Sequence, residues 1–131
     1  DHFKAVNDTY GHQVGDMVLR KFAECLSNAC RFYDFIGRHG GEEFVICLPN
    51  TDCDKGVKFA ERMRTAVEQM SIDLPGIKDP IRITASFGVA SPVKGSEENI
   101  DTLIAQADKA MYEAKSNGRN RVCKFCKGEG A

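Results

Sequence analysis

Several common features are missing from this sequence of 131 residues. It has no run of about 18 apolar residues, so no transmembrane helix is expected, and no basic-then-apolar leader opens it. It also lacks an excess of one charge, since 18 Lys and Arg face 19 Asp and Glu, whereas domains that coat nucleic acid are usually basic. We therefore expect a cytoplasmic domain that contacts neither membrane nor nucleic acid, within a parent protein that could be membrane-anchored. A local phosphate site remains open.

A second C-x-x-C is also missing, although the sequence contains six cysteines. Structural zinc sites use four ligands, and Cys123 with Cys126 supplies only two, with no histidine nearby. Disulfide frameworks are typical of small secreted domains with little core, whereas 42% of this sequence is hydrophobic. We expect reduced thiols of a cytosolic protein. A metal or redox module at Cys123 and Cys126 is the alternative.

Helical and extended patterns alternate along the chain. Amphipathic spacing predicts helices over about 15–29, from a cap at Thr51 or Asp52 to about Met70, and from after Asn99 to Asn117. The side chains of the third helix expected in the core are Leu103, Ile104, Ala107, Met111 and Ala114. Strands are expected at 35–36, 44–48, 81–90 and 121–125, the first two joined by a glycine-containing hairpin. The sequence therefore predicts one α/β domain over 1–131, with helices over a single sheet.

Three polar segments carry residues suited to chemistry. The stretch from 1 to 16 is dense in nucleotide-type ligands, Glu42 and Glu43 follow two glycines at the hairpin tip, and Lys115 and Arg119 lie at the end of the third helix. Carboxylates beside phosphates recruit Mg²⁺, and cations neutralise charge on a transferred phosphoryl group. Together the three segments suggest a metal–phosphate site.

Each of these segments also has a structural interpretation. Two glycines in a hairpin are ordinary turn chemistry, and basic residues at a helix C-terminus complement the helix dipole. Asn7 and Asp16 could be turn and cap residues, while Lys4 and His12 could be solvated surface residues. Composition and spacing by themselves do not name a reaction.

Taken in order, the motifs resemble those of the GGDEF family of diguanylate cyclases, in the GGEEF form at 40–44. The resemblance also includes DHFK at 1–4, ND-x-YGH at 7–12, GD at 15–16, SFGVA at 86–90, ADKAMY at 107–112 and AK-x-x-GRN at 114–120. It implies an α/β (α+β) fold, the ferredoxin-like palm of nucleotidyl cyclases, with a central, mostly antiparallel sheet flanked by helices. It also implies condensation of two GTP into cyclic di-GMP and two pyrophosphates. The implied enzyme is a homodimer with an upstream sensory or dimerisation domain.

The resemblance assigns roles to individual residues. Glu42 is implied as a metal ligand and as the proton acceptor, and Glu43 as a second carboxylate whose role stays open between tuning the site and the second metal. The implied cofactor is Mg²⁺ or Mn²⁺, two ions per active site. Lys4 would stabilise charge on the phosphates. Backbone N–H groups near Phe3 are implied to bind the triphosphate, and Asn7 and Asp16 to bind the guanine. His12 would line the nucleotide pocket, and Lys115 and Arg119 would bind the β- and γ-phosphates.

A regulatory site is implied as well. Arg31 and Asp34 match the R-x-x-D inhibitory site for cyclic di-GMP, and Arg62 matches a further product-binding arginine. The arginine fork suits phosphates and guanine edges, while a surface ion pair is the structural alternative. For the whole domain, the alternative to an enzyme is a non-catalytic cyclic di-GMP receptor.

The sequence departs from the family pattern at its start. The family places a metal-binding aspartate two residues before the position of Asp1, followed by a residue whose backbone carbonyl also binds the metal. Nothing precedes Asp1 here. We therefore expect an N-terminally incomplete domain that lacks its first strand, and we expect the 131-residue chain alone to be inactive and poorly stable.

Overall fold

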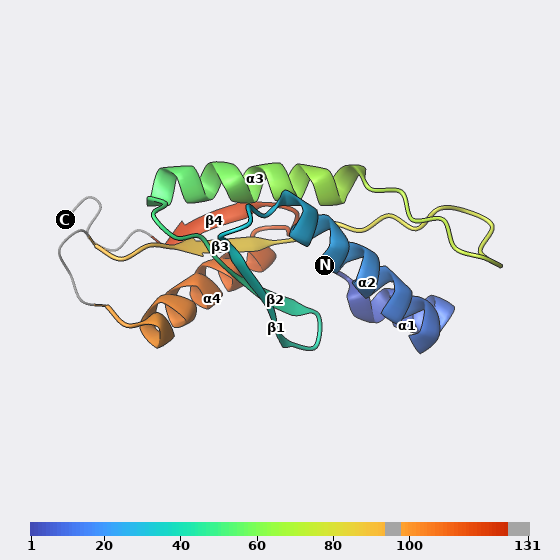
Figure 1. The fold of residues 1–131 in the computed structure, drawn as a ribbon. Coiled ribbons are helices and arrows are strands. Elements are labelled where there is room, and N and C mark those ends of the chain that lie inside the picture. The colour runs from blue at the N-terminus through green and yellow to red at the C-terminus, as the bar shows by residue number, and fades with distance from the viewer. Residues whose placement is uncertain (94–97, 126–131) are drawn as a thin grey trace.

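The computed structural model describes residues 1–93 and 98–125 as a mixture of helices and short strands. The elements follow in the order α1 (Phe3–Tyr10), α2 (His12–Ala29), β1 (Phe35–Gly40), β2 (Glu43–Cys47), α3 (Cys53–Gln69), β3 (Phe87–Ala90), α4 (Ile100–Ser116) and β4 (Val122–Phe125). The strands β3 and β4 lie between α3 and α4, and the β1–β2 hairpin projects beside them (Figure 1). The expected α+β fold is confirmed. None of these helices is long and apolar enough to cross a bilayer.

The helix ends follow local side-chain chemistry. Asp52 caps α3 by accepting a hydrogen bond from the backbone N–H of Lys55 at 2.8 Å. Asn99 caps α4 in the same way through Thr102, also at 2.8 Å. Each cap satisfies a backbone donor that the first helical turn leaves unpaired. The predicted starts of both helices, and the end of α4 at Asn117, are therefore confirmed.

The core is formed by the apolar faces of α2 and α3 against the strands. Leu26 packs with Phe59, Met63 and Val67, and half-buried side chains from β1, β2 and β3 surround them. Of the five core positions expected on α4, only Ala114 is fully buried, and the other four are half-buried. The buried residues there are Gln106, Ala110 and Ala114. The backbone of α4 lies directly against Gly88 of β3, at Ala107 and Met111.

The expected strand at 81–90 is shorter in the structure, where β3 covers only Phe87–Ala90. The preceding residues use their polar groups elsewhere. Ile81 forms an isolated antiparallel bridge with Ile72, and the carbonyl of Thr84 and the hydroxyls of Thr84 and Ser86 bond to Asp1. The predicted strand is therefore confirmed only over its last four residues.

The strands form two separate pairs in the described residues, which corrects the expectation of a single, mostly antiparallel sheet. β1 and β2 pair antiparallel, with Phe35 opposite Cys47. β3 and β4 pair parallel, with Phe87 opposite Val122. The connection explains this direction, because β4 is reached from β3 through α4, and a helical crossover brings the next strand back parallel.

The helix α1 is absent from the sequence-based expectation, which treated 1–16 as a polar, ligand-rich stretch. It contains no fully buried residue, although Val6 packs partly buried against the cluster of Val18, Ile72 and Ile81. Gly11 separates the two helices with a φ of 92°, a conformation that favours glycine. α2 consequently begins at His12, three residues before the predicted start at Gly15.

Candidate active site

Residues assigned to the guanine base meet where α1 crosses α2. The side chain of Asn7 lies directly against Gly15, and a Cβ at Gly15 would overlap its amide oxygen. This oxygen, Oδ1, is buried and has no hydrogen-bond partner. Asp16 is the next residue along α2 and is exposed. A buried acceptor without a donor is unfavourable, so the corner offers acceptors that the N–H groups of a guanine edge would satisfy.

The hairpin tip presents the two carboxylates. Gly41 adopts a left-handed φ of 51°, and its carbonyl accepts a 2.7 Å hydrogen bond from Nε of Arg38. Glu42 follows in the turn and is exposed, whereas Glu43 is half-buried and pairs with Gly40 across the ladder. The turn thus fixes the backbone of the tip and leaves the Glu42 carboxylate accessible.

Charged residues from the hairpin and from the end of α4 gather around Asp1. Lys115, Glu42 and Arg119 all lie close enough to the backbone nitrogen of Asp1 to act on it electrostatically. Glu42, Phe3 and Thr84 line a small cavity of about 30 Å³ that also borders Asp1. The structure therefore brings together Phe3, Glu42, Lys115 and Arg119, which lie far apart in the sequence.

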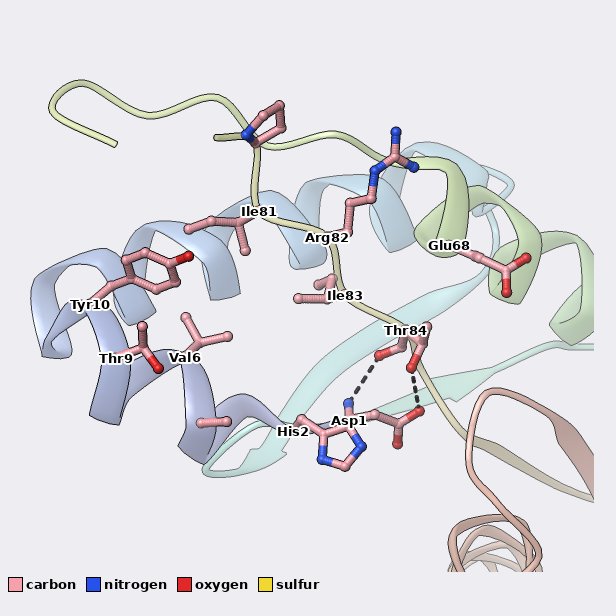
Figure 2. A pocket seen from close by; sticks show the side chains of 12 residues that line it. Asp1, His2, Val6, Thr9, Tyr10, Glu68, Ile81, Arg82, Ile83 and Thr84 are labelled. Atoms are coloured by element: carbon pink, nitrogen blue, oxygen red, sulfur yellow. Dashed lines mark hydrogen bonds between the residues drawn. The ribbon is translucent and has the colours of Figure 1, made fainter. Parts of the chain in front are cut away.

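Asp1 itself is the centre of a hydrogen-bond network. Its carboxylate accepts from the hydroxyls of Thr84 at 2.9 Å and Ser86 at 2.7 Å, and from the backbone N–H of Asn120 at 3.1 Å. Its amino group donates to the carbonyl of Thr84 at 3.0 Å, and Figure 2 shows both bonds to Thr84. Asp1 therefore ties the start of α1 to the loop that carries Arg119.

Two of the assigned residues stand apart from this cluster. Lys4 on α1 and His12 at the start of α2 are exposed, and neither makes a side-chain hydrogen bond or ion pair within the residues that the structure describes. An open cavity of about 570 Å³ lies nearby, between α1 and residues 80–84 (Figure 2). Its lining includes Asp1, Tyr10 and Glu68 but none of the assigned nucleotide residues, so we do not assign the nucleotide to it.

The residues assigned to the inhibitory site converge on one aromatic ring. The guanidinium of Arg31 lies 5.9 Å from the ring centroid of Phe59, and that of Arg62 lies 5.3 Å from it. Nε and Nη2 of Arg31 donate to the Asp34 carboxylate, and Nη2 also donates to Oγ1 of Thr51 at 3.0 Å. The Asp34 side chain has no exposed surface. In this structure Asp34 orients Arg31 and does not itself face solvent.

The available metal donors are the carboxylates of the hairpin. In 1–93 and 98–125 no group of three or more His, Cys, Asp and Glu side chains is placed to hold a metal. Cys25, Cys30, Cys47 and Cys123 carry free thiols, and Cys126 lies outside the described residues. Mg²⁺ is commonly held by one or two carboxylates together with water and substrate phosphates. Glu42 and Glu43 fit that partial donor set.

The exposed Glu42 carboxylate and the buried, unpaired Oδ1 of Asn7 are the features on which a comparison with known proteins bears. A family model described as "Diguanylate cyclase, GGDEF domain" matches residues 1–121. The chain therefore belongs to the GGDEF domain family. It is 45% identical over 122 residues to diguanylate cyclase A of Treponema denticola, a match that covers 93% of this chain and 32% of that protein. The chain spans about a third of the length of the curated relatives it matches.

Solved structures show the same fold. The GGDEF domain of DgcB from Caulobacter crescentus in complex with c-di-GMP superposes with a TM-score of 0.85 and 33% identity, over 95% of this chain and 72% of that one. The active GGEEF domain of a diguanylate cyclase from Vibrio cholerae superposes with a TM-score of 0.80 and 33% identity, over 98% and 79% of the two chains.

Some residues that shape the site received no role from the sequence. Asp1, Ser86 and Asn120 fall in motifs of the resemblance, yet nothing in their spacing indicates that they bond to one another. The only indication in the sequence is that Ser86 and Asn120 are polar residues within apolar or glycine-containing segments. Only the fold brings them together, because Ser86 is 85 positions and Asn120 is 119 positions from Asp1.

Proposed function

We propose that this domain is a metal-dependent diguanylate cyclase that condenses two GTP into cyclic di-GMP with release of two pyrophosphates. The observation that carries the proposal is the placement of Glu42 and of the loop bearing Arg119 beside Asp1, which lines the same small cavity as Glu42 and accepts a hydrogen bond from the backbone N–H of Asn120, in a chain of the GGDEF family. Glu42 would supply a carboxylate, and Lys115 and Arg119 would supply positive charge for the phosphates.

In the proposed reaction, the carboxylate accepts a proton and the two basic residues bind the leaving group. The 3′-hydroxyl of one GTP attacks the α-phosphorus of the other, and its proton passes to the Glu42 carboxylate. Pyrophosphate leaves with the electrons of the broken P–O bond, while Lys115 and Arg119 hold its β- and γ-phosphates. Mg²⁺ or Mn²⁺ held by Glu42 and Glu43 would lower the pKa of the attacking hydroxyl and offset phosphate charge. Lys4, exposed on α1, would complete the positive surface when nucleotide binds.

Guanine is proposed to bind where α1 crosses α2. The buried Oδ1 of Asn7 has no partner in the protein, and Asp16 adds an exposed carboxylate next to Gly15. Both are acceptors, which matches the N–H donors on the guanine edge. Phe3 packs near Gly15, 3.5 Å from the position of a Cβ there, and begins the helix whose first backbone N–H groups would face the triphosphate. His12 would close the outer side of the nucleotide pocket.

Substitution of the hairpin carboxylate tests the proposal. Glu42→Gln keeps the shape of the side chain but removes its ability to accept a proton, so we expect roughly 10²–10⁴-fold slower formation of cyclic di-GMP. The measurement is the rate at which the purified protein forms cyclic di-GMP from GTP and Mg²⁺. Glu113→Gln, on the exposed surface of α4, controls for loss of one negative charge. Unchanged turnover in Glu42→Gln would contradict the assignment.

We also propose product inhibition through Arg31 and Arg62. Both guanidinium groups lie within 6 Å of the Phe59 ring centroid, so a single bound phosphate or guanine could contact the two. Removing one charge-assisted hydrogen bond should raise the cyclic di-GMP concentration needed for half inhibition by roughly tenfold. Arg31→Ala is therefore compared with Arg20→Ala, an exposed arginine of α2. Equal inhibition of both variants would refute this site.

A non-catalytic receptor is the second candidate, and the cluster of Arg31, Arg62 and Phe59 is the observation that favours it. The two functions make different predictions. An enzyme makes cyclic di-GMP from GTP and loses that ability in Glu42→Gln. A receptor binds cyclic di-GMP tightly, makes none, and is unaffected by Glu42→Gln.

A further inference from the structure

The loop after α4 holds Arg119 and Asn120 in an unusual backbone conformation. Arg119 has a φ of 64° and Asn120 a φ of 48°, so two consecutive residues with side chains occupy the left-handed region. Such conformations are uncommon outside glycine and persist where surrounding contacts hold them. The backbone N–H of Arg119 donates to the carbonyl of Ala114 at 3.0 Å, which fixes the loop against the last turn of α4.

Asn120 is anchored on three sides. Its backbone N–H donates to Oδ2 of Asp1 at 3.1 Å. Its Oδ1 accepts from Nη1 of Arg64 at 3.0 Å, and its Nδ2 donates to Oε2 of Glu68, both residues of α3. Arg64 also pairs with Glu68, at 3.6 Å. The side-chain amide of Asn120 therefore has a donor for its oxygen and an acceptor for its nitrogen, and Asn120 is half-buried.

These contacts bear directly on the direction of Arg119. Arg119 is exposed and makes no side-chain hydrogen bond or ion pair in the described part of the chain, so the loop backbone fixes only the point and direction from which its side chain leaves the chain. That backbone is adjacent to Asn120, whose own backbone and side chain are fixed by Asp1 and α3. The carboxylate of Asp1 is in turn fixed by Thr84 and Ser86.

We propose that Asn120 is a positioning residue, which holds Arg119 in the conformation that binds the terminal phosphates of the nucleotide. The inference rests on the proposed function, because it presumes that Arg119 contacts these phosphates. Because Arg64 and Glu68 belong to α3, the position of α3 then affects the affinity of the site for a nucleoside triphosphate. Asn120 does not contact the nucleotide itself.

Asn120→Asp tests the role with little change in shape. Aspartate also tolerates the left-handed region, and it keeps an acceptor for Arg64. It replaces the donor that faces Glu68 by an oxygen, so two carboxylates oppose each other. Adding Glu68→Gln restores a donor–acceptor pair with reversed direction. Arg119→Ala removes the phosphate contact itself.

The readout is the ratio of the dissociation constants of GMP and GTP, measured by calorimetry with Mg²⁺ on the same chain. GMP lacks the β- and γ-phosphates, so a positioning defect at Arg119 weakens GTP binding alone. We expect a loss of roughly tenfold in this ratio for Arg119→Ala and a loss in the same direction for Asn120→Asp. Asn120→Asp should add little to Arg119→Ala, and Glu68→Gln should restore the ratio in Asn120→Asp.

The outcomes separate the inference from the function on which it rests. An unchanged ratio in Arg119→Ala overturns the phosphate role of Arg119. A reduced ratio in Arg119→Ala with an unchanged ratio in Asn120→Asp overturns the positioning role. Equal weakening of GMP and GTP in Asn120→Asp, or no rescue by Glu68→Gln, shows a purely structural effect and also overturns it. If Asn120→Asp does not fold, Arg64→Gln removes a single anchor and is judged by the same ratio.

Discussion

At the scale of single residues, the pairing of Arg31 with Asp34 shows how a buried carboxylate directs an arginine. The Asp34 carboxylate accepts from the backbone N–H, Nε and Nη2 of Arg31. Arg31 remains 37% exposed, and its guanidinium lies 4.6 Å from the ring centroid of Tyr33. Because the side chain is already ordered, a ligand that binds it loses less conformational entropy than with a freely rotating arginine.

This pairing predicts a pH-dependent difference in stability. The hydrogen bonds from Arg31 lower the pKa of Asp34 below its usual value, so the folded state favours the ionised carboxylate. The resulting stabilisation is fully present above a pH of about 4, the ordinary value for aspartate, and is lost as the pH falls through the lowered pKa. We expect Asp34→Asn to unfold at a lower temperature at neutral pH, by on the order of a few degrees.

The difference in unfolding temperature between wild type and Asp34→Asn should stay constant from neutral pH down to about pH 5, and it should become smaller below about pH 4. Thermal unfolding followed by circular dichroism measures it. Asp108→Asn, an exposed carboxylate of α4, controls for the general effect of removing one negative charge. If this difference in unfolding temperature does not change with pH, the charge of Asp34 does not contribute to the stability of the fold.

At the scale of elements, the sequence predicts best what local chemistry determines. The caps at Asp52 and Asn99 depend on bonds to residues three positions away, and the apolar spacing of Met63 and Val67 marks the buried side of α3. Motif order likewise places Glu42 in the turn before β2. These features need no knowledge of the rest of the fold.

Features that depend on distant partners were not predictable in the same way. α1 is an exception, because Phe3, Val6 and Tyr10 follow the helical spacing of i, i+3 and i+7, although the helix has only eight residues and none of them is buried. The alternating pattern before β3 predicts a strand, yet β3 begins only at Phe87, and the hydroxyls of Thr84 and Ser86 donate to the distant Asp1. The meeting of Arg31 and Arg62 at one ring depends on how α3 packs.

The contact between β3 and α4 gives a prediction at this scale. A Cβ at Gly88 would overlap the carbonyl oxygen of Ala107 and the backbone nitrogen of Met111. Backbone atoms in a helix cannot move aside singly, so Gly88→Ala should separate β3 from α4 and cost about 1–3 kcal/mol of unfolding free energy. Gly37→Ala is the matched control in β1, because a Cβ there meets nothing within 4 Å. Equal stability of both variants in urea unfolding would contradict the close packing.

At the scale of the whole molecule, one chain offers a single set of the proposed substrate-binding groups. Within residues 1–93 and 98–125, the proposed base-binding corner of α1 and α2, the hairpin carboxylates and the basic end of α4 each occur once. Cyclic di-GMP contains two phosphodiester bonds, each formed by attack of one 3′-hydroxyl on the α-phosphorus of the other nucleotide. Two protomers that face each other would supply one Glu42 for each attack. The proposed homodimer follows from this requirement for two equivalent bonds.

Mixed dimers test the division of labour. In a dimer of wild type and Glu42→Gln, the wild-type carboxylate can accept the proton for the first attack, which releases one pyrophosphate and leaves a linear dinucleotide. The second attack needs the substituted carboxylate, so ring closure should slow by roughly the 10²–10⁴-fold expected for a general base. Wild type mixed with an excess of Glu42→Gln should therefore accumulate the linear 5′-triphosphate dinucleotide, detected by chromatography and mass spectrometry. Glu113→Gln in the same excess should leave cyclic di-GMP as the product. If the Glu42→Gln mixture also yields only cyclic di-GMP, in proportion to the wild-type protein, each protomer completes both bonds and the facing half-sites are wrong.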